Sequence, residues 1–333
     1  MDPFLLTGTE GIKTMHEKET FCMITPSETW RSDGLLLLTA VIWGTAFVAQ
    51  RVGVDFVGPF TFNGIRFALG SLVLLPLIMT NTISNGRDRS QEKPVGRGVM
   101  IFGGVLIGVF LFGGASLQQV GIVYTTAGNA GFITGLYVVI VPIMGLLFRQ
   151  KTTAGTWIGA FLAVFGLYLL SVTAQFTMGY GDFLVLLGAF FWAGHVLVIG
   201  WLSPKFNSFK LAFFQYAACS VMSLVTAAFI ESMTIDGIYR AAIPILYGGI
   251  MSVGIAYTLQ VVAQKKAHPA HAAILLSMES VFAAIAGWIL LDEVMSSRQM
   301  GGCALMLSGM LLSQLWGFAS SKTTVTERPH YRE

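Results

Sequence analysis

Glu279, His195 and Arg66 stand well inside long apolar stretches of this 333-residue chain. A charged side chain at the centre of a bilayer costs roughly 2.5–3.5 kcal/mol or more, so Glu279 should face a cavity or a partner. Two roles remain open for this carboxyl group. It could bind a proton or a substrate amine, or it could hydrogen-bond neighbouring helices together with Ser277 and Ser280.

His195 is the histidine in the middle of an apolar stretch, FFWAGHVLVIG. An imidazole titrates near neutral pH and suits a proton switch, but a neutral ring could equally bond helix to helix. Arg66 lies a few residues into the stretch NGIRFALG. It could clamp an anionic substrate group. We favour instead an arginine at the outer end of its helix, which reaches the lipid headgroups or pairs with Asp55.

Trp43 and Trp192 lie at matching places in two apolar stretches, 149 residues apart. Tryptophan usually gathers at the membrane interface, so two central residues are atypical. They could wall a central cavity that binds apolar or aromatic solutes, or they could only pack helices. Further polar side chains could line such a cavity or bond between helices: Gln118, Gln119, Asn129, Tyr137, Gln215, Tyr257 and Gln260.

Several kinds of chemistry find no support in the sequence. The three cysteines form no CxxC pair and are expected to be free thiols. His268 and His271 lie beside Lys265 and Lys266, which disfavours a cation site. No Gly-Lys-Ser/Thr loop for ATP and no long basic run for nucleic acid occurs. We therefore expect no metal, no cofactor, no nucleic-acid partner and no enzyme. An intramembrane transferase that acts on lipids remains an alternative, although no nucleophile–base pair supports it.

Composition places the chain in a membrane. Hydrophobic residues make up 54% and charged residues 11% of the sequence, whereas soluble domains carry about 25% charged residues. Ten apolar segments approach the roughly 20 residues that a helix needs to cross the hydrocarbon core. They cover 34–52, 60–79, 98–119, 125–148, 154–173, 181–201, 209–230, 242–263, 270–291 and 299–318. The predicted fold is an all-α integral membrane protein with ten transmembrane helices.

Basic residues set the predicted orientation. With the N-terminus in the cytoplasm, the outward loops hold only Arg51, Arg240 and Arg298, and Arg66 lies within a span. The other 16 of the 20 Lys and Arg residues then lie inside. Because inward loops are enriched in Lys and Arg, both termini are expected in the cytoplasm.

Two halves of the chain repeat one unit. Gly145 corresponds to Gly287 and Gly159 to Gly301, each at a spacing of 142 residues, and Asn129 corresponds to His271. Each half has five spans, so the second must be inverted relative to the first, as in secondary transporters. The predicted organisation is a flexible tail at 1–32, repeats at 34–173 and 181–318, and a tail at 319–333.

Particular motifs carry a resemblance to a known family. WGTAF at 43–47, Arg66 in NGIRFALGSLVLLPL, MESVFAAIAGWILLDE at 278–293 and the two repeats resemble the drug/metabolite transporter superfamily, in its EamA-domain branch. The resemblance covers about residues 34–318 and implies ten helices, cytoplasmic termini and transport of small metabolites such as amino acids. Many members have Pro just after the Glu of the ninth span. Here Ser280 stands there, so the sequence leaves open whether the helix breaks at that point.

The resulting expectation is a secondary-active transporter of the cell (inner or plasma) membrane that works by alternating access. Its partners would be a small-molecule substrate, membrane lipid and, as a coupling ion, the proton. Amino acids or related compounds are the expected substrates, because Glu279 and polar amides in an aromatic-lined cavity suit a zwitterion. Alternatives are a multidrug or nucleotide-type carrier of the same superfamily and, further off, a passive channel or an intramembrane enzyme.

Overall fold

The structure, a computed structural model, describes residues 26–79, 97–147, 152–171 and 179–290, and between 296 and 316 the residues 296–298, 300–302, 304–309, 312 and 316. This part of the chain contains helices and turns and no strand. The helices are α1 (Pro26–Gly53), α2 (Pro59–Met79), α3 (Arg97–Tyr124), α4 (Ala127–Gly135), α5 (Tyr137–Leu147), α6 (Ala154–Ser171), α7 (Tyr180–Leu202), η2 (Ser203–Lys205), α8 (Ser208–Ile230), α9 (Ile235–Arg240), α10 (Ala242–Leu246), the π-helix η3 (Tyr247–Tyr257), α11 (Thr258–Ala263), α12 (Pro269–Leu276) and α13 (Glu279–Leu290).

Eight helical stretches of the described chain are long and apolar enough to cross a membrane. They are Trp30–Gly53, Pro59–Met79, Gly98–Tyr124, Ala130–Leu147, Tyr180–Lys205, Ser208–Ile230, Ala242–Ala263 and Pro269–Leu290. The fifth and tenth predicted spans correspond to shorter apolar helical stretches, Ala154–Gly166 and Met300–Gly309. The chain is therefore an all-helical, multi-pass membrane protein, and the count of ten spans stays a prediction.

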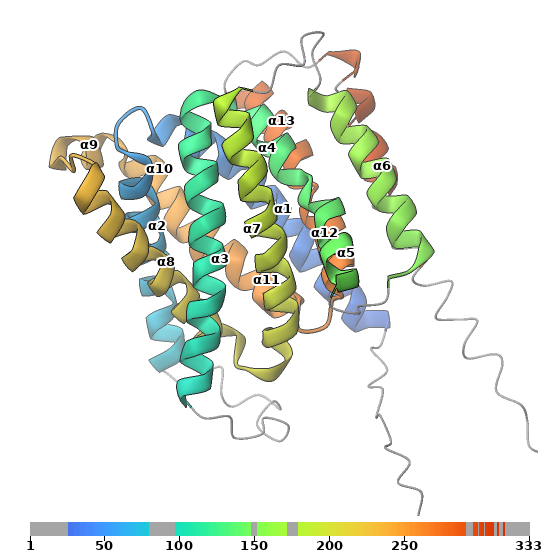
Figure 1. The fold of residues 1–333 in the computed structure, drawn as a ribbon, viewed down its shortest axis with the longest axis horizontal. Coiled ribbons are helices and arrows are strands. Elements are labelled where there is room, and N and C mark those ends of the chain that lie inside the picture. The colour runs from blue at the N-terminus through green and yellow to red at the C-terminus, as the bar shows by residue number, and fades with distance from the viewer. Residues whose placement is uncertain are drawn as a thin grey trace, which may run out of the picture.

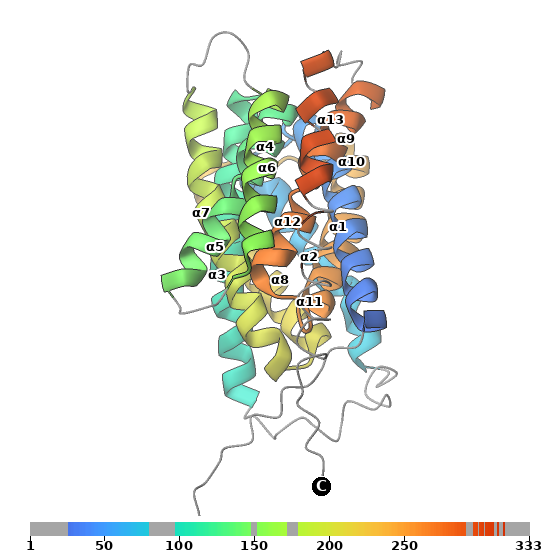
Figure 2. The same cartoon turned by 90° about the vertical axis from the view of Figure 1, so that its right-hand side faces the viewer.

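The helices run roughly side by side along one direction of the bundle (Figure 1). The first helix of each half runs in the opposite sense to the other: α1 runs from the lower to the upper end of the view, and α7 from the upper to the lower end (Figures 1 and 2). The same reversal relates α2 to α8. Opposite directions at matching places are what an inverted repeat requires.

Two of the spanning stretches are broken near their middles, and at equivalent positions. The first break, at Leu136 between α4 and α5, is bridged by a hydrogen bond from the Leu136 amide to the Ile133 carbonyl at 3.2 Å. The second, between α12 and α13, is bridged by the Met278 amide bonding the Leu275 carbonyl at 3.2 Å. Such i→i+3 bonds tighten the backbone locally. The helix is therefore interrupted near Ser280 without a proline, at a point where the sequence had left a break open.

Helix α1 begins at Pro26, ahead of the predicted boundary at residue 34, so the last part of the predicted tail is helical. Proline suits the first position of a helix, because its fixed φ is helical and it has no amide hydrogen to leave unpaired. One consequence is that Asp33 lies inside a helix and is buried. It accepts a hydrogen bond from His271 on α12, with 2.9 Å between Oδ1 and Nε2.

A carboxylate from the second half of the chain caps a helix of the first half. Glu231, at the end of α8, accepts from the amides of Phe60 and Thr61 at 2.8 Å and from the Thr61 hydroxyl at 2.7 Å. These amides belong to the first turn of α2, where helical hydrogen bonding leaves donors unpaired and the dipole favours negative charge. The cap joins α2 to α8, its counterpart in the other half.

Candidate functional site

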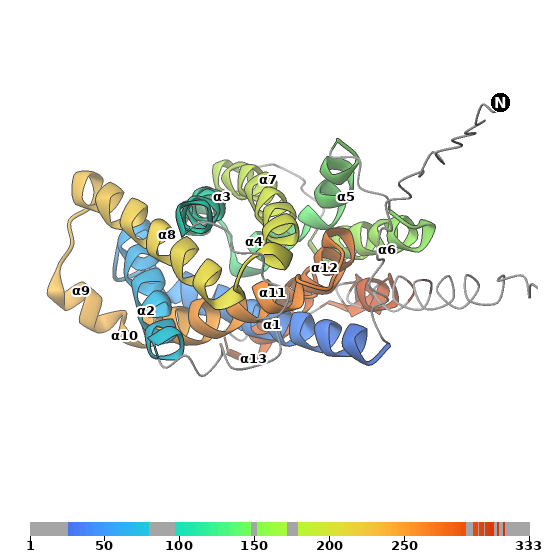
Figure 3. The same cartoon turned by 90° about the horizontal axis from the view of Figure 1, so that it is seen from below.

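A cavity lies between both halves of the chain, among α1, α2, α3, α4, α5, α7, η3, α11, α12 and α13. Its lining residues are Trp43, Ala46, Phe47, Gln50, Arg66, Gln118, Thr134, Tyr137, Trp192, His195, Val196, Ser252, Tyr257, Gln260, Leu276 and Glu279. Viewed from below, α11 and α12 lie toward the middle of the bundle, with α1 on one side and α3 and α7 on the other (Figure 3). The volume open to the centres of water molecules is about 30 Å³, so the cavity as it stands has room for a few waters and none for a metabolite.

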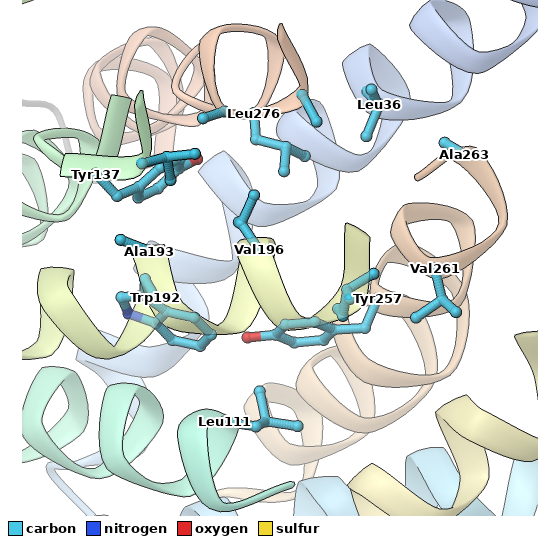
Figure 4. Packing of buried hydrophobic residues seen from close by; sticks show 14 of the residues in the cluster. Leu36, Leu111, Tyr137, Trp192, Ala193, Val196, Tyr257, Val261, Ala263 and Leu276 are labelled. Atoms are coloured by element: carbon cyan, nitrogen blue, oxygen red, sulfur yellow. The ribbon is translucent and has the colours of Figure 1, made fainter. Parts of the chain in front are cut away.

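Three aromatic rings wall the cavity. The ring of Tyr257 lies between the two tryptophans, with its centroid 4.4 Å from that of Trp43 and 6.1 Å from that of Trp192. Figure 4 shows the Tyr257 hydroxyl pointing toward Trp192, with Tyr137 on the other side of Val196. Gly114 on α3 makes this possible, because a Cβ atom there would come within 2.9 Å of the Trp192 indole. The two tryptophans therefore contact a common ring.

Polar bonds hold the tryptophans in place. The Trp192 indole donates to the side-chain oxygen of Gln118 at 3.0 Å, and Gln118 in turn donates to the side-chain oxygen of Gln50 at 3.0 Å. The Trp43 indole donates to the backbone carbonyl of Ser252 at 3.3 Å. Since buried polar groups are costly when unpaired, these bonds fix the orientation of both rings.

Arg66 is buried and faces this cavity, so our preferred prediction of an interfacial arginine was wrong. Its Nε donates to the side-chain oxygen of Asn63 at 2.9 Å, and its guanidinium lies 4.9 Å from the centre of the Phe67 ring. Asp55, the partner that we considered, is bound instead to Arg51 at 2.8 Å. In the described ranges no carboxylate forms an ion pair with Arg66. The burial follows from the place of α2, whose face with Arg66 packs inward against α8 and η3.

Glu279 is the first residue of α13 and is buried at the break between α12 and α13. Its neighbour across the cavity is Tyr137, the first residue of α5, whose buried hydroxyl interacts with the Glu279 carboxyl group. Ser280 does not bond this carboxylate; it donates to the Gly131 carbonyl at 2.6 Å, and Ser277 donates to the Ile274 carbonyl. Both serines thus bond backbone carbonyls and not the Glu279 carboxyl group, which faces the cavity.

His195 is fully buried on α7 at the edge of the cavity. Its Nε2 lies 2.9 Å from the side-chain oxygen of Gln215, which can only accept, so this nitrogen is the donor. Its Nδ1 atom has no partner. The ring also lies edge-on to Trp192 and Tyr257, at centroid distances of 5.8 and 5.9 Å.

The structure thus gathers most of the residues singled out in the sequence around one space, but not all of them. Gln119 points away: it is buried and donates to the Gln50 carbonyl at 3.2 Å. The side chain of Asn129 lies outside the described residues. Its counterpart His271 bonds Asp33 and does not line the cavity. Among the described residues, no group of His, Cys, Asp or Glu side chains could hold a metal ion.

Sequence reasoning missed Gln50, Thr134 and Ser252, which line the cavity with Ala46, Phe47, Val196 and Leu276. One available signal was the repeat itself. At the spacing of 142 residues, Gln118 corresponds to Gln260 and Tyr137 to Glu279, and all four line the cavity. A lining position in one half therefore points to its counterpart in the other.

Comparison with known proteins gives matches over both halves. The profile of the EamA-like transporter family matches residues 30–172 and again residues 179–315. An uncharacterized transporter of Archaeoglobus fulgidus is 30% identical over 309 residues, covering 92% of this chain and 89% of the relative. The uncharacterized transporter YoaV of Bacillus subtilis is 22% identical and covers 84% of this chain and 95% of its own.

Two further matches cover similar shares of this chain. The WAT1-related protein At3g02690, chloroplastic, of Arabidopsis thaliana is 24% identical over 84% of this chain and 68% of its own length. One crystal structure superimposes with a TM-score of 0.68 at 19% identity, covering 86% of this chain and 97% of the other. That likeness concerns the fold alone.

Proposed function

This chain belongs to the EamA-like transporter family, and on that premise we propose that it is a secondary-active carrier of amino acids or related zwitterionic metabolites. The observation that carries the proposal is that one buried carboxyl group, Glu279, and one buried guanidinium, Arg66, line the same cavity without forming an ion pair. A zwitterion presents a cation and an anion at once. Charged residues within a membrane are costly, so both are best explained by a ligand that satisfies them.

Each group would have a defined task. The Glu279 carboxylate would accept from the substrate ammonium group, and the planar Arg66 guanidinium would donate to the substrate carboxylate. The rings of Trp43, Trp192 and Tyr257 would contact the substrate side chain. Glu279, with His195 nearby, would also take up the coupling proton when no amine is bound, which links transport to a proton gradient.

The cavity supports alternating access. Its small present volume suits an occluded conformation, closed to both sides, and argues against an open channel. The broken helices α4–α5 and α12–α13 give two places where the lining can bend. We further propose ten spans in two inverted repeats, 34–173 and 181–318, with both termini in the cytoplasm and the protein in the cell membrane.

A second candidate is a carrier of planar aromatic solutes, such as drugs or nucleotides. The aromatic walls favour it, since flat rings stack well on Trp43 and Trp192. An enzymatic role receives no support from the transporter family or from the cavity residues.

The test is counterflow. Purified protein in liposomes is loaded with an unlabelled amino-acid mixture, and the uptake of labelled amino acids is followed one at a time, with and without a pH gradient. We expect the internal solute to accelerate uptake of a subset of amino acids. Uptake that neither saturates nor responds to internal solute would indicate a channel. Stimulation only by aromatic drugs or nucleotides would replace the amino-acid proposal with the second candidate.

A further inference from the structure

A second hollow lies on the outer surface of the bundle, on the far side of α1 from the central cavity. It is lined by Thr45, Val48, Ala49, Val52, Phe56, Arg240, Ile243, Pro244, Tyr247 and Leu290. The volume open to water-sized molecules is about 410 Å³, within the range of pockets that hold small ligands. The groove shares no lining residue with the central cavity, so it is a separate site.

Four of its residues form one face of α1. Thr45, Val48, Ala49 and Val52 follow a spacing of three and four residues, which places them one above another along the helix. Helices α10 and α13 flank that face; Figure 3 shows α1, α10 and α13 along the same edge of the bundle. The walls are apolar and open sideways, as the strong exposure of Ile243 (81%) shows.

The floor of the groove is sealed by polar contacts. The hydroxyl groups of Thr45 and Tyr247 are hydrogen-bonded to each other, and the Tyr247 hydroxyl also donates to the Ile42 carbonyl at 3.2 Å. These bonds tie α1 to the π-helix η3 and separate the groove from the central cavity. Because both hydroxyl groups are paired, the floor presents no unsatisfied polar group to an apolar ligand.

Arg240 stands at the mouth. It is exposed, and its guanidinium lies 4.8 Å from the centre of the Phe56 ring, which holds it over the groove. The ion pairs among the described residues are Arg51–Asp55 and His271–Asp33, so the charge of Arg240 is not compensated by a carboxylate there. Asp236, one turn earlier on α9, does not pair with it.

The groove is deep enough to hold part of a lipid acyl chain. Arg240 lies over Phe56, three residues past Gly53, where α1 and its apolar span end. Thr45 lies eight residues before Gly53, about 12 Å at the rise of an α-helix. Apolar walls below a guanidinium that has no ion pair with a described carboxylate suit a molecule with an acyl chain and a phosphate. Arginine pairs with phosphate through two parallel hydrogen bonds.

We propose that this groove is a binding site for an anionic phospholipid, with one acyl chain along the α1 face and the phosphate on Arg240. The negative headgroup is selected because, among the described residues, no carboxylate pairs with this guanidinium. The site is independent of the transported substrate, so it stands or falls separately from the proposed function.

Native mass spectrometry of the purified protein tests the proposal with phosphatidylglycerol and phosphatidylcholine of identical acyl chains. Arg240→Gln removes the charge at an exposed position, and Ala49→Phe fills the groove. Arg298→Gln is the matched control, because Arg298 also lies over an aromatic ring, Tyr168, at 5.3 Å but away from the groove.

We expect the wild type and Arg298→Gln to retain phosphatidylglycerol roughly fivefold better than phosphatidylcholine, the effect of one basic side chain on an anionic lipid. Arg240→Gln should lose the preference, and Ala49→Phe should lose the bound lipid. Equal retention of both lipids by the wild type would overturn the proposal. So would an unchanged preference in Arg240→Gln, whatever the behaviour of Ala49→Phe.

Discussion

Glu279 and Arg66 bring opposite charges to one cavity from opposite halves of the chain. Arg66 comes from α2 and Glu279 from the first turn of α13, where the helix dipole favours a carboxylate. If the two halves move relative to each other during transport, the fit of both groups to one ligand changes with them. The two residues are therefore the direct place to test substrate recognition.

Replacing Glu279 by Gln keeps the shape and removes the charge. We expect the apparent affinity for the transported amino acid to fall more than tenfold, since losing one partner of a buried charge pair costs about 2–5 kcal/mol. The response of uptake to a pH gradient should disappear as well. Asp55→Asn, which changes an exposed carboxylate, is the control and should behave as wild type. Unchanged transport at every pH in Glu279→Gln would make Glu279 a structural residue.

Arg66→Lys tests the shape of the cationic group. Lysine keeps the charge but lacks the planar fork that matches a carboxylate. We expect weaker binding of amino acids and little change for amides that lack the carboxylate, measured as competition for uptake. Equal loss for both kinds of competitor would indicate that Arg66 supports the fold through Asn63 and does not read the substrate.

At the scale of elements, the broken helices and the close contact of α1 with α13 determine where Glu279 lies in the central cavity. Gly44 on α1 lies against the first turn of α13. A Cβ atom there would come within 2.8 Å of the Glu279 carbonyl oxygen and the Ala283 amide nitrogen. Small residues at such contacts let helices approach closely. The position of Glu279 therefore depends on this glycine.

Gly44→Ala should push α13 away, destabilise the protein by about 1–3 kcal/mol and reduce transport. Gly34→Ala on the same helix is the matched control, because nothing lies within 4 Å of a Cβ atom there. The control should keep or slightly raise the unfolding temperature, since alanine favours helix over glycine. Similar unfolding temperatures for the two variants would contradict the close packing of α1 and α13.

The Glu231 carboxylate that caps α2 should stabilise the fold. Glu231→Gln replaces one accepting oxygen by an amide group that cannot accept from the first turn of α2. Hydrogen bonds to charged groups contribute about 1.5–3 kcal/mol each, so the unfolding midpoint in detergent should fall clearly. Asp55→Asn breaks only an exposed ion pair, worth about 0–1 kcal/mol, and should hardly change the midpoint. A larger shift in Asp55→Asn than in Glu231→Gln would contradict the capping role.

For the whole molecule, composition and apolar length predicted the helical membrane fold, and both halves match the family that the motifs at 43–47 and 278–293 resemble. The side chains around the cavity were harder to predict. Whether Arg66 reaches the membrane surface or is buried depends on which face of α2 packs against α8. The local sequence does not predict that face. The break before Glu279 could not be predicted because it arises from backbone tightening at Ser277 and Met278, without a proline.

Orientation can be tested on the same scale. Asp236 on α9 and Lys205, which follows the end of α7, are exposed. Helix α9 lies at the upper end of the bundle, and α7 ends at the lower end (Figure 1). In a variant without the native cysteines, Asp236→Cys should react with an impermeant maleimide on intact cells. Lys205→Cys should react only after the membrane is opened. The reverse pattern would contradict the orientation inferred from the Lys and Arg distribution.

The central claim is that the cavity between the two halves is the transport site. Counterflow of the preferred amino acid should be measured for Ala46→Trp, which places an indole in the cavity, and for Leu38→Trp, which places one on the exposed face of the same helix. We predict that Ala46→Trp folds and loses counterflow while Leu38→Trp retains it. Full counterflow by a folded Ala46→Trp protein would show that the substrate takes another path.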